Sequence, residues 1–275
     1  MKSFKLVALL LVLTLCFGCL FSCVNSDNTN VTDDTHKTPD DDTNKEVEEN
    51  LQTETYKISV RVAFASDDDV MKAAIRNLNS AATSTVIEVD KNNLCITNTA
   101  EVGGYSVSKT YTLVDSTLYR HSVIRSSDML ASEHEWATIT ERDVDNLLAT
   151  KGEGAGIGIG DFMQVNMSKI KNGMYYECSE ISNNAAKSLE EIFEQNFSAA
   201  EATIKLDSAS YKLETYKGRN TSSTLTCNFV ITMNDVDYTL TMRLYYTYDY
   251  DAQINISVPS DADIYTEVSY TEIVK

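Results

Sequence analysis

The sequence predicts an α+β fold in which a large curved antiparallel sheet, a half-barrel, has helices packed on its concave face. Three observations lead to this prediction. Short segments of alternating apolar and polar residues recur throughout 51–275, as in strands that bury one face. Three other segments have apolar residues at helical spacing. Runs of strands separate these helical segments, and this order is typical of an α+β domain and not of a βαβ series.

The clearest strand is 54–64, where Tyr56, Ile58 and Val60 alternate with polar residues. Turn-forming pairs such as Asn172-Gly173 separate the strands, and Asp207-Ser208 is expected to form another turn. A sheet of about ten strands or more usually curls, splits or closes. Strands of regular alternation are also expected at 105–113, 225–233, 236–248 and 254–258, and weaker ones at 84–89, 93–99, 117–125, 134–139, 161–168, 174–181, 203–207 and 210–216.

Helices are expected at 69–82, 140–149 and 185–200. Three acids, Asp67 to Asp69, are available as the N-cap of the first helix. Each helix has one apolar stripe, which must be buried against the sheet. Seven residues of the first and third stripes are candidate ligand-binding walls of an apolar cleft, with ordinary core packing as the alternative for each: Met71, Ile75, Leu78, Leu189, Ile192, Phe193 and Phe197.

Residues 1–22 have the features of a secretory signal, with Lys2 and Lys5 followed by an apolar run that ends at Phe21. This run is too short to cross a membrane comfortably, because a transmembrane helix needs about 20 apolar residues. It leads into Leu20-Phe21-Ser22-Cys23, which resembles the lipobox of bacterial lipoproteins. The resemblance implies that Cys23 becomes the lipid-modified first residue of the mature chain. An ordinary cleaved signal followed by a chance cysteine is the alternative.

Residues 23–50 comprise the candidate lipidated cysteine and an acidic segment, which has nine acids and two bases between positions 24 and 50. This segment has no aromatic residue and cannot build a core, so it is predicted to be a disordered tether. A cluster such as Asp40-Asp41-Asp42 lacks the glycine and closing glutamate of an EF-hand loop. The remaining residues, 51–275, are predicted to form a single α+β domain.

The order of elements resembles that of the LolA-like group of half-barrel lipoproteins, including acyl-lipid-binding ones. The resemblance is in strand 54–64 followed by helix 69–82, in the hairpin at Asn172-Gly173-Met174-Tyr175 before helix 185–200, and in the closing segment 254–259. It implies a cavity between sheet and helices that takes acyl chains or another apolar ligand. It brings no catalytic residue with it.

Residue types that carry catalysis or bind metals are sparse. His134 lies between Glu133 and Glu135, but in a strand the two carboxylates point away from the imidazole, and His134 is expected to be exposed. The sequence has no Cys-x-x-Cys or His-Glu-x-x-His spacing, so no metal and no cofactor are predicted. The glycine run 152–160 lacks the ending of a phosphate loop and is expected to be a flexible connection. We therefore expect a protein without enzymatic activity.

Three further observations limit the function. A formal net charge of −18 argues against nucleic-acid binding. Cys95, Cys178 and Cys227 are an odd number, so at least one thiol stays free and at most one disulfide forms. The tyrosines near 238–250 are expected to pack in the core at 246 and 248 and to point the other way at 245, with a sugar-stacking platform as the alternative.

Together these observations predict a lipoprotein of the cell membrane, held on its extracytoplasmic face by Cys23. Its expected role is to bind or carry an apolar, lipid-like ligand without catalysis. The alternative is a cell-surface interaction module that binds a protein or a glycan and whose sheet packs solidly against its helices. The two differ in whether the apolar face encloses an open cleft.

Overall fold

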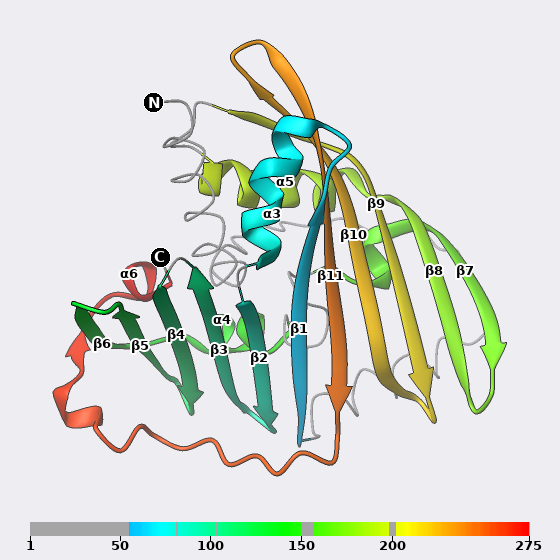
Figure 1. Ribbon diagram of the computed structural model, residues 1–275. Coiled ribbons are helices and arrows are strands. Elements are labelled where there is room, and N and C mark those ends of the chain that lie inside the picture. Colours follow the sequence, from blue (N-terminus) through cyan, green and yellow to red (C-terminus); the bar gives the residue numbers. More distant parts are fainter. Residues whose placement is uncertain (1–54, 81, 103, 150–156, 198–201, 275) are drawn as a thin grey trace.

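The computed structural model describes residues 55–80, 82–102, 104–149, 157–197 and 202–274. Their strands form one twelve-stranded sheet in the order β12-β6-β5-β4-β3-β2-β1-β11-β10-β9-β8-β7 (Figure 1). Neighbouring strands are antiparallel except β12, which runs parallel to β6. The strands are β1 (Thr55–Ala65), β2 (Ala82–Asp90), β3 (Asn93–Val102), β4 (Tyr105–Val114), β5 (Thr117–Arg125), β6 (Leu130–Thr138), β7 (Phe162–Ile170), β8 (Gly173–Ile181), β9 (Thr203–Tyr216), β10 (Arg219–Met233), β11 (Val236–Asp249) and β12 (Thr266–Glu267).

The predicted fold class was wrong. The described part of the chain consists mostly of strands with few helices, and its single mixed sheet is not closed. The helices of the described residues are few and are not packed on a concave face: α3 (Asp69–Ser80), α4 (Glu141–Ala149), α5 (Asn183–Phe197) and α6 (Tyr270–Ile273). Alternation in the sequence correctly indicated one buried face in long strands such as β9, β10 and β11, but it contains no information on the curvature of the sheet.

Most expected elements exist, with two instructive differences. The two strands expected at 203–207 and 210–216 are one continuous strand, β9, because Asp207 is an extra residue in a β-bulge and not part of a turn. The strand expected at 254–258 is absent, and this segment connects β11 to the far edge of the sheet. Its alternating residues have no neighbouring strand with which to pair, and alternation alone does not provide one.

One face of the sheet holds a continuous apolar core. Strand β10 illustrates the pattern, because Leu225, Cys227, Phe229 and Ile231 are each at most 1% exposed while the residues between them are half-buried. Helix α5 contacts β9, and its Phe193 ring lies 4.2 Å from the ring of Phe229, centroid to centroid. Burial of these large side chains is the main stabilising contribution to the fold.

The C-terminal segment covers the edge of the sheet at β6. After β11 it crosses to the opposite side of the sheet, where β12 pairs with β6 and α6 follows (Figure 1). Ile273 is fully buried, and the Arg120 guanidinium donates to the carbonyl oxygens of Glu272 and Ile273 at 3.2 and 2.9 Å while it pairs with Glu135. An uncovered edge strand invites pairing with another chain, so this segment protects the sheet.

A stacked pair of histidines lies beneath the C-terminal segment. His121 and His134 are register partners on β5 and β6, with ring centroids 4.2 Å apart. Tyr265 packs edge-on against His134, whose Nε2 lies 3.6 Å from a carboxylate oxygen of Asp261. The expectation that His134 is an exposed strand residue was therefore wrong, because only 17% of its side chain is exposed. The sequence could not reveal that a distant segment covers it.

Among the described helices, none is long and apolar enough to cross a membrane.

The hairpin of β7 and β8 provides a test of the packing against β9. A Cβ added to Gly173 would lie 1.8 Å from the backbone oxygen of Thr215, a contact that only a backbone shift can relieve. We expect Gly173→Ala to lower the free energy of unfolding by about 2 kcal/mol or more. Urea unfolding would measure this, with Gly160→Ala as the control, since a Cβ there meets nothing within 4 Å. An equal effect of the two substitutions would contradict this packing.

The histidine pair predicts a pH dependence of stability. Burial, followed by the neighbouring His134, lowers the pKa of His121 below its usual 6.5, against an opposing effect of Asp261. The unfolded chain then binds a proton more tightly than the folded chain, so the fold loses stability as the pH falls below 6.5. We expect His121→Gln to reduce the loss of thermal stability between about pH 7.5 and 5. If the melting temperatures of the two proteins fell by the same amount across this pH range, the assignment to His121 would be refuted.

Candidate functional site

The central strands separate to form a fork. Strands β1 and β2 pair only from Thr55↔Asp90 to Val60↔Thr85. Beyond this point β1 continues with β11 as far as Ala65↔Thr241, while β2 pairs with β3 from Ala82↔Glu101 onward. Residues 61–65 and 82–84 therefore diverge, and α3 lies above the opening (Figure 1). At the fork, β1 and β2 no longer pair with each other through their backbones.

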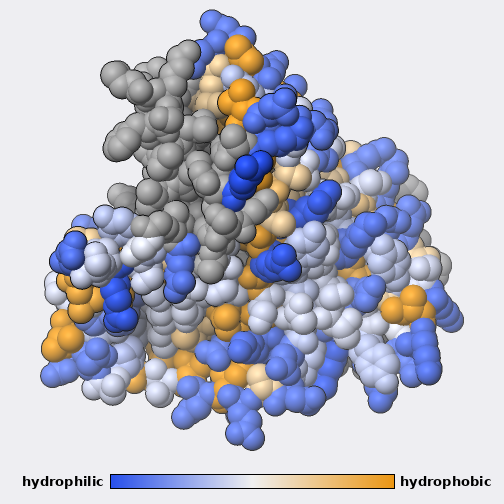
Figure 2. All heavy atoms as spheres, in the orientation of Figure 1, coloured by the Kyte–Doolittle hydropathy of each residue, from blue (hydrophilic) through white to orange (hydrophobic). Residues whose placement is uncertain are grey.

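An open cleft of about 590 Å³ lies at the fork, and we call it the fork cleft. Its volume lies within the range of about 300–1,000 Å³ typical of ligand pockets. Pale atoms of intermediate hydropathy cover much of the middle of the sheet in Figure 2, and strongly hydrophilic atoms are common toward the rim. The cleft is lined by Ser59, Val60, Arg61, Ala63, Thr83, Ser84, Tyr245 and Thr247.

Strand alternation explains most of this lining. Tyr246 and Tyr248 are buried, as expected, so Tyr245 and Thr247 point to the opposite face. In β1, Ile58 and Val60 are buried, so Arg61 points to the same face as Tyr245, its register partner. The side chain of Tyr245 is 38% exposed. The ring is therefore available to a ligand on one side while its strand holds it in place.

The chemistry of the cleft is that of a polar binding site. Its lining offers hydroxyl groups, one phenol and one guanidinium, and none of these eight residues is acidic. The hydroxyl oxygen of Ser84 lies 2.7 Å from that of Thr99, which continues the hydroxyl row onto β3. Hydroxyls both donate and accept, and Arg donates only. Within this lining no serine stands beside a histidine or a carboxylate that would activate it, so the arrangement favours binding.

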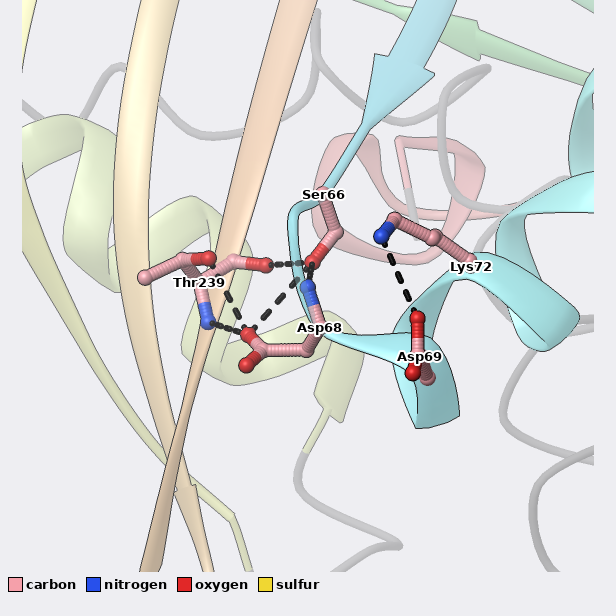
Figure 3. Close-up of polar contacts among 5 residues, drawn as sticks. All are labelled: Ser66, Asp68, Asp69, Lys72 and Thr239. Atoms are coloured by element: carbon pink, nitrogen blue, oxygen red, sulfur yellow. Dashed lines mark hydrogen bonds and ion pairs between the residues drawn. The ribbon is translucent and has the colours of Figure 1, made fainter.

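The turn from β1 into α3 is fixed to β11 by Asp68 (Figure 3). Its carboxylate accepts hydrogen bonds from the backbone N and the Oγ1 of Thr239 at 2.7 and 3.0 Å. Ser66 Oγ donates to the Thr239 carbonyl at 2.5 Å, and Lys72 pairs with Asp69 at 3.2 Å. The hydrogen bonds from the backbone and the side chain of Thr239 are the main cause that holds the pKa of Asp68 below its usual range. The expected N-cap carboxylate therefore binds a distant strand instead, and this fixes the start of α3 to β11.

The predicted cleft-wall residues lie elsewhere. Met71, Ile75, Leu189 and Phe193 are buried in the continuous core, at exposures of 5, 5, 1 and 2%. Leu78, Ile192 and Phe197 belong to α3 and α5, and their side chains lie outside the described part of the structure. None of the four residues whose side chains are described lines the fork cleft. That these residues contact a ligand stays a prediction.

Cys23, the signal, the tether and residues 152–156 of the glycine run lie outside the described residues. Cys95, Cys178 and Cys227 are free thiols, so none of them forms a disulfide with another. Burial raises the pKa of Cys227 to about 12, as expected for a structural thiol. In the described ranges, no group of three or more His, Cys, Asp or Glu residues is arranged to hold a metal ion.

Sequence reasoning missed the fork cleft because it concentrated on apolar faces. The signal that it could have used is the row of Ser, Thr and Arg at the polar positions of strand 54–64 and of the strands that pair with it. That row marks a polar face, but it does not reveal where two strands part.

Comparisons with known proteins leave the family open. No family model matches the chain, and no curated protein matches it. Among solved structures, the ywiB protein from Bacillus subtilis is 8% identical with a TM-score of 0.18, over 73% of this chain and 96% of that one. MucB in complex with MucA(peri) is 8% identical with a TM-score of 0.13, over 77% of this chain and 99% of that one. Similarity at this level supports no inference about fold or function.

Proposed function

We propose that this chain is a lipid-anchored, extracytoplasmic binding protein that takes a glycan in the fork cleft. The single observation behind the ligand is the lining of that cleft, which combines hydroxyls, an exposed tyrosine ring and a guanidinium without a carboxylate. Sugars present many hydroxyl groups and an apolar ring face. Serine and threonine hydroxyls pair with the first, and an aromatic ring packs against the second.

The anchor is supported by sequence. The apolar run ends at Leu20-Phe21-Ser22-Cys23, and an acidic segment follows at once. Each buried CH₂ of a lipid chain contributes about 0.8 kcal/mol to membrane binding, and two or more chains hold a protein stably. As a flexible chain, the 27 residues from 24 to 50 have a root-mean-square reach of about 30 Å. A domain on such a tether meets glycans of the envelope while it remains attached to the membrane.

Carriage of a lipid has less support than glycan binding. A carrier needs an apolar space that its ligand can enter. The four described residues for which such a role was predicted are packed in the core, as the contact of the Phe193 and Phe229 rings illustrates. Lipid carriage is therefore an outcome that the experiment must be able to detect, and not the proposal.

The test is a binding titration of the purified full-length protein with neutral and acidic oligosaccharides, followed by calorimetry. We expect Tyr245→Ala to weaken glycan binding by about tenfold, which corresponds to about 1.4 kcal/mol, because the ring loses its contact with the sugar face. Tyr105→Ala is the matched control, since Tyr105 is also an exposed tyrosine but lies on β4, outside the cleft lining.

Two results would overturn the proposal. One is equal affinity of the Tyr245→Ala and Tyr105→Ala proteins for a glycan that the unmodified protein binds. The other is the absence of glycan binding together with a stoichiometric acyl lipid in the organic extract of protein that was purified without detergent, which would establish lipid carriage instead.

A further inference from the structure

We infer that the fork cleft selects acidic glycans, whose carboxylate or phosphate groups bind Arg61 and Arg243. This inference rests on the proposed function and adds the charge of the ligand to it.

The two arginines belong to one face of two paired strands. Arg61 lines the cleft and is the register partner of Tyr245, while Arg243 is the register partner of Ala63, another lining residue. Arg61 and Arg243 are therefore diagonal neighbours across β1 and β11, a position in which Cα atoms lie about 7–8 Å apart. Both side chains are exposed. The guanidinium groups of two long side chains at this spacing can reach one ligand.

Neither arginine is neutralised by the residues that the structure describes. The ion pairs there involve Lys72, Arg120, His134, Lys187 and Lys212. At the other end of β1 the situation is different, because Lys57 has Glu88 and Asp249 as its two register partners. One end of β1 thus places a cation between two acids, while the other end of β1 and the adjoining part of β11 carry one cation each without an acidic register partner.

The acids near the cleft are set back from it. On the β2 side, Glu101 is the register partner of Ala82 and lies one strand further out than the lining residue Ser84. On the β11 side, Asp68 is held by Thr239, four residues before Arg243. In a chain with a net charge of −18, an acid-free lining next to two arginines is a local reversal of charge.

Such a pair suits an anionic sugar. Like charges on diagonal positions repel, and a bound anion removes this repulsion. The planar guanidinium binds a carboxylate or a phosphate through two parallel hydrogen bonds, which a neutral hydroxyl cannot match. Tyr245 is the register partner of Arg61 and lies two residues from Arg243 on the same face, so a sugar ring packed on it holds an acidic substituent close to both arginines.

The experiment compares two matched pairs of probes with the full-length protein. The first pair is an oligogalacturonate and the same oligomer with its carboxylates reduced to alcohols. The second pair is a mannose oligomer with a phosphate monoester and the same oligomer after dephosphorylation. We expect at least tenfold tighter binding of the charged member in one pair, and that pair identifies the acidic group. Arg61→Gln and Arg243→Gln should each reduce this preference several-fold while binding of the neutral member persists.

Arg125→Gln is the matched control, because it removes the same charge from an exposed position on β5, outside the cleft lining. It should leave the preference unchanged. Equal binding of the charged and neutral members would overturn this inference and leave glycan binding intact. A preference that Arg61→Gln and Arg243→Gln do not alter, or that Arg125→Gln reduces equally, would overturn the assignment to these arginines. Binding of none of the probes, with well-folded protein, would count against the proposed function itself.

Discussion

The pairing of β1 with both β2 and β11 is the constraint on which the rest of the structure depends. β1 is the first described strand of the chain, yet it lies at the centre of the sheet and joins β2–β6 to β7–β11. It forms six register pairs with β2 and nine with β11. These are long-range contacts, because β1 and β11 are separated by most of the domain, so the two parts of the sheet cannot be joined before the chain is nearly complete.

The unequal pairing of β1 creates the fork. Six of its eleven residues pair with β2, and the remaining ones follow β11 alone. A sheet of this size accumulates twist from strand to strand. Helix α3 leaves from the free end of β1, and Asp68 fixes its start to Thr239 of β11. The fork cleft thus follows from the same geometry that joins the two parts of the sheet.

The two faces of the sheet differ in the side chains that they carry. The apolar face is a packed core with side chains such as Phe229 and Tyr211 almost fully buried. The other face is rich in hydroxyl groups near β1 and β11, and at β5 and β6 the C-terminal segment covers its histidine pair. The polar face near the fork exposes Arg61, Tyr245 and Arg243, and this is where the proposed ligand would bind.

The sequence by itself determined which residues of the long central strands face the core, as the buried Leu244 and Tyr246 on either side of the exposed Tyr245 illustrate. It also indicated the three longer helices to within a few residues, because period 2 and period 3.6 are local properties of the chain. Tertiary structure alone decided that the sheet stays open, that Asp207 forms a bulge and that 254–258 has no strand partner. It also decided that Asp261 and Tyr265 cover His134 and that β1 parts from β2 beside Arg61. Each of these depends on pairing between distant segments, and local periodicity does not specify which segments pair.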